Sequence, residues 1–147
     1  MEKNPVIELR NVAVFHSAKP GSSNPKKRGE MVVSGVNLTV CEGEMVYFIG
    51  KVGSGKSSLI KTLYAEVPLV EGEGRIVGFD LRRMKRRDIS RLRRSIGIVF
   101  QDYQLLSDRD VFGNLHYVMK ATGWKNETDM RKRIEEVLSV VGLENKA

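Results

Sequence analysis

Eight consecutive residues combine three glycines with two lysines and two serines: Gly50-Lys51-Val52-Gly53-Ser54-Gly55-Lys56-Ser57. Glycines permit the tight backbone that turns successive N–H groups toward one point, where phosphate oxygens accept hydrogen bonds. The spacing satisfies the P-loop pattern G-x-x-x-x-G-K-[S/T], in which the lysine reaches the β- and γ-phosphates and the last hydroxyl ligates Mg²⁺. We therefore predict a phosphate site, with Ser57 as the Mg²⁺ ligand, made by Gly50, Gly53, Ser54, Gly55, Lys56, Ser57 and Ser58.

The segments on both sides of this loop are of the kind that a P-loop requires. The apolar run Met45–Ile49 predicts a central strand that is covered on both faces. After the loop, Leu59, Ile60, Leu63 and Tyr64 recur at helical spacing. The alternative is a glycine-rich turn before an ordinary helix. It is disfavoured, because such a turn would not require the full motif together with an apolar strand before it and an amphipathic helix after it. A Rossmann fingerprint is excluded, because Ser58 stands where its third glycine is required.

The remaining N-terminal sequence predicts short strands and one helix. Alternation indicates strands at Val6–Val12 and Val36–Val40, and a further β section follows a turn at Gly72–Gly74. Prolines, glycines and charges predict a loop at Ser17–Gly29. The other predicted elements of this part are a turn at Cys41–Glu44, a helix at Asp88–Arg94 and a buried strand at Ser95–Phe100.

The C-terminal third predicts two amphipathic helices. Val111, Leu115, Val118 and Met119 share one helical face, and Gly123 ends that helix. The second helix carries an apolar face made by Met130, Ile134, Val137, Leu138 and Val141. Thr128 or Asp129 is its expected cap, and Gly142 its expected end. No internal repeat is evident.

Composition limits the class of protein without identifying the activity. The chain has 147 residues with 25 basic and 18 acidic side chains, a net charge of +7 and a single cysteine, Cys41. An internal disulfide is excluded, and the charge favours phosphates, nucleic acid or an anionic membrane as partners. The sequence contains no secretory signal and no apolar run of membrane-spanning length, so we expect any membrane association to be peripheral.

Eight of the basic residues lie between Arg82 and Arg94. Three interpretations are open: contact with anionic lipid or an acidic partner, binding of nucleic acid, or a solvated helix face whose arginine stems cover apolar neighbours. No aromatic residue lies among the arginines, which weakens the interpretation as a nucleic-acid site. The Lys26–Arg28 run is expected to be a solvated loop.

Three longer segments resemble the ATP-binding subunits of ABC transporters: IELRNV, VNLTVCEGEMVYFIGKVGSGKSSLIKTLY and LRRSIGIVFQDYQLLSDRDVFGNL. Within that family, the segment VFQDYQLLSDRDVFGNL at residues 99–115 and the VMKATG segment at residues 118–123 most resemble the cell-division (FtsE) subfamily. The resemblance implies an α/β P-loop core with a small antiparallel β-subdomain in residues 1–104. It also implies the start of a helical subdomain in residues 105–147.

The resemblance also implies function. Its members bind ATP and Mg²⁺, pair head-to-tail as homodimers and drive a membrane partner, FtsX-like in the cell-division subfamily, where they control cell-wall hydrolysis. The expected location is peripheral, on the cytoplasmic face of the inner membrane. Gln101 matches the Q-loop glutamine, which contacts Mg²⁺ or the γ-phosphate, and Phe15, with His16 beside it, is the candidate for stacking on adenine.

Several hydrolytic elements of the family are missing from this sequence. There is no LSGGQ-type signature, no switch histidine, and no Asp-Glu pair after an apolar strand; Asp80 is followed by Leu81, and His116 lies in a predicted surface helix. We expect a C-terminally truncated subunit. Alone, it should bind ATP weakly, aggregate readily and show no ATPase activity above background.

Other functions remain open from the sequence alone. Lipoprotein-release and macrolide-export ATPases carry similar segments. A soluble ABC ATPase acting on DNA or ribosomes would use the positive charge, and a non-hydrolysing nucleotide-binding module would fit the residues present. A small-molecule P-loop kinase is disfavoured, because no segment resembles an acceptor-binding lid.

Overall fold

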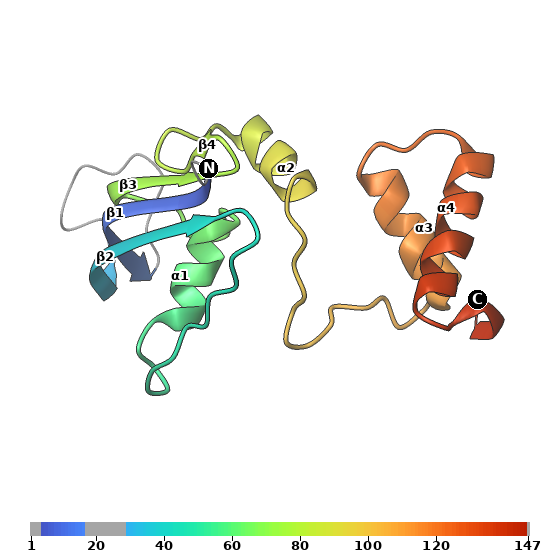
Figure 1. Ribbon diagram of the computed structural model, residues 1–147, viewed down its shortest axis with the longest axis horizontal. Coiled ribbons are helices and arrows are strands. Elements are labelled where there is room, and N and C mark those ends of the chain that lie inside the picture. The colour runs from blue at the N-terminus through green and yellow to red at the C-terminus, as the bar shows by residue number, and fades with distance from the viewer. Residues whose placement is uncertain (1–3, 17–28, 147) are drawn as a thin grey trace. The chain divides into compact units, whose positions relative to one another are not determined.

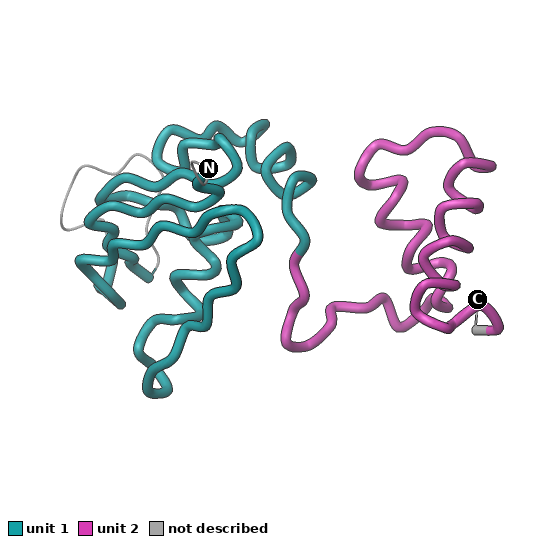
Figure 2. Tube along the Cα trace, in the orientation of Figure 1, with its two compact units in different colours: residues 1–97 teal, residues 98–147 magenta. Residues whose placement is uncertain are grey.

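The computed structural model describes residues 4–16 and 29–146. The chain divides into two compact units, residues 1–97 and 98–147 (Figure 2). The predicted loop Ser17–Gly29 lies, apart from Gly29, outside the described residues, and so does the Lys26–Arg28 run. The functional division after residue 104 stays a prediction.

The first unit is built on an antiparallel sheet with the strand order β2-β1-β3-β4 (Figure 1). Its strands are β1 (Pro5–His16), β2 (Glu30–Cys41), β3 (Glu71–Ile76) and β4 (Phe79–Asp80). The strands predicted near residues 6–12 and 36–40 are confirmed, and both are longer than predicted. The predicted turn at Gly72–Gly74 is wrong, because these residues lie inside β3, where Glu73 and Gly74 pair with Arg10 and Leu9 of β1. The β-subdomain of the predicted fold class is therefore present.

The main core lies on one face of the sheet, and part of the opposite face carries charged side chains. Leu9, Val12 and Val14 of β1 are buried in a core that also receives leucines from two helices, α1 (Lys56–Leu63) and α2 (Arg86–Arg94). On the opposite face, Glu8 of β1 lies across from Arg75 of β3, and Arg10 lies across from Glu73. Alternation along β1 thus places α1 and α2 on one side of the sheet and leaves the charged ladder to solvent.

The hairpin between β3 and β4 contains a strained residue. Val77 has φ 46° and Gly78 has φ 81°, as a two-residue turn with both residues in the left-handed region requires. Glycine and asparagine adopt this conformation readily, whereas a β-branched side chain does not.

We expect Val77→Asn to raise the free energy of unfolding by about 1 kcal/mol, because it relieves this strain. Little packing is lost, since Val77 is 43% exposed and its backbone N–H, which donates to Val6 O at 2.9 Å, is retained. Urea unfolding followed by circular dichroism measures the change, with Val77→Ala as an intermediate control. A less stable asparagine variant would contradict the assignment of strain.

Two predicted strands are wrong. Met45–Ile49 and Ser95–Phe100 are irregular in the structure, and most of their side chains are exposed, with Ile49 at 92% and Val99 at 91%. Phe48 and Ile96 are half-buried and pack against the core. A strand covered on both faces needs hydrogen-bonded neighbours and flanking helices. Among the described residues, no strand pairs with either segment. The apolar runs thus indicate a buried environment that the described part of the chain does not supply.

The second unit contains the helices α3 (Val111–Ala121) and α4 (Glu127–Val140) and the short 3₁₀ helix η2 (Glu144–Lys146). Both predicted helices are confirmed, and the glycines after them, Gly123 and Gly142, have positive φ as expected. The predicted cap of the second helix is wrong: the Asn126 side chain accepts from Thr128 N at 2.9 Å. Within the described ranges, no helix is both long and apolar enough to cross a bilayer.

Glu127 links α4 to α3. Its carboxylate lies 2.7 Å from Lys120 Nζ and 2.6 Å from His116 Nε2. Hydrogen bonds from Lys120 and then His116 hold the pKa of Glu127 below its ordinary value of 4.5. A lowered pKa means that the interaction stabilises the folded state above pH 4.5 and is lost as pH falls through the folded pKa.

We therefore expect wild type to be more stable than Glu127→Gln at neutral pH, with the difference shrinking below pH 4.5. Helical circular dichroism during urea unfolding at several pH values measures this. Glu135→Gln on the same helix is the control, since Glu135 makes no ion pair with the described residues. A difference that is independent of pH would contradict the ionic role.

Candidate nucleotide-binding site

The predicted phosphate loop joins the irregular segment after residue 44 to α1. Gly53 and Gly55 adopt left-handed backbone conformations, with φ 81° and 87°. Gly55 is the N-cap of α1 and offers no side-chain cap, so the N–H groups of the first helical turn are left for an external acceptor. These free donors and the positive end of the helix dipole favour an anion at this position.

Strand β2 of the sheet packs closely against the C-terminal end of the phosphate loop. A Cβ on Gly55 would lie 2.9 Å from Val32 Cγ1 and 3.2 Å from Val33 Cβ, both on β2. At Gly50, a Cβ would lie 3.1 Å from Ser54 Oγ. The glycines at 50 and 55 therefore allow close packing as well as unusual torsion angles. The valines of β2 are supporting residues that sequence reasoning missed, since no motif marks them.

Lys56 folds back into the loop that it follows. Its Nζ donates to Gly50 O at 2.8 Å and to Lys51 O at 2.7 Å, and it lies 3.3 Å from Ser54 Oγ. The ammonium group is thus held at the loop by backbone carbonyls. A phosphate at this position would replace these neutral acceptors with charged oxygens, which make stronger hydrogen bonds.

The two serines after the lysine occupy different environments. Ser57 is exposed, and its hydroxyl makes no hydrogen bond to the described residues. Ser58 is buried, with 9% of its surface exposed, at the first turn of α1. Both line a cavity of about 150 Å³ that is completed by His16, Val32, Gly53, Ser54, Gly55 and Lys56. The cavity therefore combines free N–H groups, one ammonium and a free hydroxyl.

The residues that line this cavity do not include Phe15 or Gln101, the two remaining predicted site residues. Phe15 is 8% exposed and packs with Ala13 and Val70, while its neighbour His16 lines the cavity. Gln101 is exposed in a turn at residues 101–104 and belongs to the second unit. Their roles toward adenine and toward Mg²⁺ or the γ-phosphate stay predictions.

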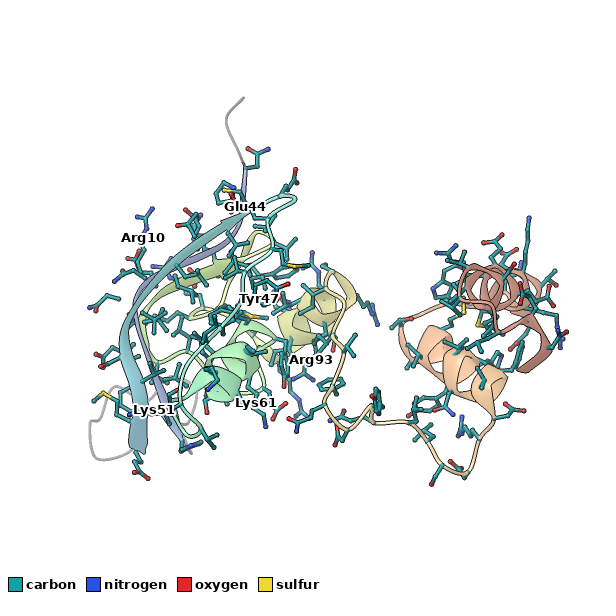
Figure 3. All side chains as sticks on the ribbon, turned by 60° about the horizontal axis from the view of Figure 1, so that its bottom comes forward. Arg10, Glu44, Tyr47, Lys51, Lys61 and Arg93 are labelled. Carbon is teal, nitrogen blue, oxygen red and sulfur yellow. The ribbon has the colours of Figure 1, made fainter. Side chains whose placement is uncertain are left out.

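Arg93 of α2 holds the far end of α1, a contact that sequence reasoning missed. Its Nε donates to Tyr64 O at 3.1 Å and its terminal amino group donates to Ala65 O at 3.4 Å. Figure 3 shows Arg93 where α2 approaches α1. A guanidinium at a helix C-terminus satisfies free carbonyls and complements the dipole. The basic run was recognisable in the sequence, but this contact between two helices was not.

A buried tyrosine closes the same end of α1. Tyr64 Oη donates to Glu66 at 2.8 Å, and Lys61 Nζ lies 2.8 Å from the same carboxylate. Burial, followed by the hydrogen bond to Glu66, raises the pKa of Tyr64, while hydrogen bonds from Lys61 and Tyr64 lower the pKa of Glu66. The C-terminal end of the helix that carries Lys56 and Ser57 is therefore held by both the Arg93 contacts and this local group.

The residues present fit a nucleotide phosphate with Mg²⁺. The free donors suit phosphate oxygens, and the exposed Ser57 hydroxyl is an oxygen ligand of the kind that Mg²⁺ accepts. Among the described residues, no cluster of three or more His, Cys, Asp or Glu side chains could hold a metal ion by itself. Mg²⁺ commonly binds through few protein ligands together with substrate phosphates, which agrees with this arrangement.

Comparison with known proteins gives close relatives. The sequence profile of the ABC transporter family matches residues 33–147. The chain is 42% identical over 141 residues to the cell division ATP-binding protein FtsE of Streptococcus pneumoniae serotype 2, covering 96% of this chain and 56% of FtsE. It is 37% identical over 123 residues to the methionine import ATP-binding protein MetN of Carboxydothermus hydrogenoformans, covering 84% of this chain and 36% of MetN.

Solved structures agree with these relatives. CbiO1 from Clostridium perfringens, part of the ABC transporter complex CbiONQ, superposes with a TM-score of 0.77 at 25% identity, covering 98% of this chain and 53% of CbiO1. The ATP-binding cassette MJ0796, solved as a dimer with ADP and Pi, gives a TM-score of 0.71 at 27% identity, covering 90% of this chain and 56% of MJ0796. The chain spans about half the length of FtsE, CbiO1 and MJ0796. Because the profile covers most of the sequence and FtsE aligns with nearly all of it, the chain belongs to the ABC transporter family, among its ATP-binding subunits.

Proposed function

We propose that this chain binds Mg-ATP through the loop at residues 50–58. The observation that carries the proposal is the position of Lys56, whose ammonium lies 2.8 and 2.7 Å from two loop carbonyls directly beside the free N-terminus of α1. Lys56 and the backbone N–H groups hold the phosphates, Ser57 ligates Mg²⁺, and His16 lies beside the bound nucleotide. When bound, Mg²⁺ neutralises part of the negative charge of the phosphates.

In the whole protein, this binding drives a membrane partner. The sequence similarity to FtsE, 42% against 37% for MetN, supports a place in cell division with an FtsX-like partner. A nucleotide-dependent dimer is supported by the similarity to the dimeric cassette MJ0796. Methionine import is the competing assignment, because MetN relatives also match. The location that follows is peripheral, on the cytoplasmic face of the membrane.

Isothermal titration of the 147-residue chain with ATP, with and without Mg²⁺, tests the binding proposal. We expect saturable binding that Mg²⁺ strengthens. Absence of binding by a chain that retains its circular dichroism spectrum would refute it. Co-expression of the whole protein with an FtsX-like membrane protein and, separately, with a methionine permease tests the partner. Co-purification with the permease alone would favour methionine import.

Hydrolysis by this chain is a separate expectation. We expect phosphate release no faster than background, because no aspartate in the sequence is followed by a glutamate that could polarise the attacking water. A malachite-green assay at saturating Mg-ATP measures the rate. Turnover that disappears in Lys56→Ala would mean that another group in the chain activates water.

A further inference from the structure

The positive charge of the chain is concentrated in one short segment. Residues 81–95 contain eight basic side chains and one acidic side chain, Asp88. The rest of the chain contains 17 basic and 17 acidic side chains and is therefore neutral. The net charge of +7 thus belongs to residues 81–95, which comprise α2 and the turn before it.

Some of these basic groups have structural roles. Arg93 holds the C-terminus of α1, and Arg82 donates to Gly72 O at 3.2 Å. Arg91 lies 6.0 Å from the centre of the Phe79 ring. Asp88, the acidic group of the segment, is the third residue of α2, and its carboxylate accepts from the backbone N–H of the N-cap residue Lys85 at 3.0 Å. The same carboxylate also lies 3.9 Å from Arg87 Nε and 3.9 Å from Arg91 Nη1, but as a single acidic group it offsets only one of the eight positive charges of the segment.

The exposed side of α2 carries three arginines, of which Arg91 also contacts the Phe79 ring. Arg87, Arg91 and Arg94 recur at positions i, i+4 and i+7, so they share a face, while Leu92 points into the core with no exposed surface. The side chains of Arg87 and Arg91 are 79% and 71% exposed. Arg94 forms no ion pair with the described residues. We name Arg87, Arg91 and Arg94 the arginine stripe.

The shape of the surroundings favours an extended partner over a small anion. A cavity of about 530 Å³ is lined by residues just before α2 in the sequence. Its lining includes the basic residues Arg75, Arg82 and Arg83 and the acidic residues Glu73 and Asp80. Its carboxylates disfavour a small anion there. The stripe itself lies on an exposed helix face, where guanidinium groups can each reach a different phosphate of a continuous surface.

We propose that the arginine stripe contacts the anionic phospholipid headgroups of a membrane surface. Clusters of four to eight basic residues on an amphipathic helix are the usual signature of such contact. The segment contains no aromatic side chain that could stack on bases, which disfavours single-stranded nucleic acid. The choice of lipid rests on the proposed function, which places the chain beside a membrane partner.

Vesicle flotation tests the proposal, because bound protein rises with lipid whereas aggregated protein sinks. The full chain is mixed with vesicles of phosphatidylglycerol and phosphatidylcholine, or of phosphatidylcholine alone, at low and high salt. We expect binding to the anionic vesicles only, weakened by salt. Arg87→Gln with Arg94→Gln should weaken it about tenfold or more. Lys125→Gln with Lys132→Gln, which removes the same charge from exposed positions of the second unit, should leave it nearly unchanged.

Three results would overturn the proposal: no flotation with anionic vesicles, equal loss in both double variants, or binding to duplex DNA that is tighter than to vesicles and depends on the stripe. The test is independent of the nucleotide site. The Lys56→Ala variant should still float with the anionic vesicles, and the Arg87→Gln, Arg94→Gln double variant should still bind Mg-ATP. Failure of ATP binding with intact flotation would therefore reject the proposed function and leave the lipid contact standing.

Discussion

Replacing Lys56 by alanine should lower the affinity for Mg-ATP on the order of 100-fold. The ammonium would make charge-assisted hydrogen bonds to phosphate oxygens, each contributing about 1.5–3 kcal/mol. In the free protein it donates to Gly50 O and Lys51 O, and both residues are exposed, so water replaces the lost donor. The variant should therefore keep its fold while losing its ligand. Titration calorimetry measures the affinity, and circular dichroism checks the fold.

Lys51→Ala is the matched control for this experiment. Lys51 lies in the same loop and carries the same charge, but it occupies a variable position of the pattern and is exposed (Figure 3). Its loss should change affinity only slightly. Equal losses in the two variants would mean that the loop attracts ATP by general charge, and unchanged affinity in Lys56→Ala would reject the phosphate assignment.

Replacing Gly72 by alanine should destabilise the first unit by about 3 kcal/mol or more. Gly72 has φ 84°, and an added Cβ would lie 2.4 Å from Asn11 O and 2.7 Å from Val12 Cα. These are backbone atoms of the central strand β1, so the strands β1 and β3 would have to separate at the core. Such a loss is a large part of the stability of a typical domain. Urea unfolding measures it, and loss of soluble expression would be its extreme form.

Gly78→Ala separates the clash from the torsional cost. Gly78 has a similar φ of 81°, but nothing lies within 4 Å of its added Cβ. We expect it to cost about 1 kcal/mol, the strain of a left-handed non-glycine residue. If both alanine variants lost the same stability, the close approach of β1 and β3 at Gly72 would not limit packing.

The sequence predicted local structure well wherever local pattern decides it. The helices α3 and α4, the buried face of α4 and the glycines that end both helices depend on residues near in sequence, and so does the alternation in β1 and β2. The predicted apolar face of α3 is not buried among the described residues, since Val118 is 55% exposed. The cap of α4 was missed by two residues, since Asn126, Thr128 and Asp129 are all good capping residues and only the backbone geometry distinguishes them.

Elements that depend on distant partners were predicted less well. Met45–Ile49 has the composition of a buried strand, but strand formation also requires a neighbour to pair with, and composition does not supply one. For the site, the loop residues 50–58 were found through a contiguous pattern. Phe15, Val32 and Arg93 owe their surroundings to register and helix packing, which spacing in the sequence does not reveal.

The hydrogen bonds of Lys56 to its own loop limit which ligands can bind there. An incoming ligand must compete with two carbonyl oxygens at 2.8 and 2.7 Å that already solvate the ammonium. A neutral group gains nothing from that exchange, whereas a multiply charged anion exchanges dipoles for full charges. We therefore expect the loop to select by anion valence before base or sugar is recognised. A nucleoside without its phosphate tail should be rejected at this first step, whatever base it carries.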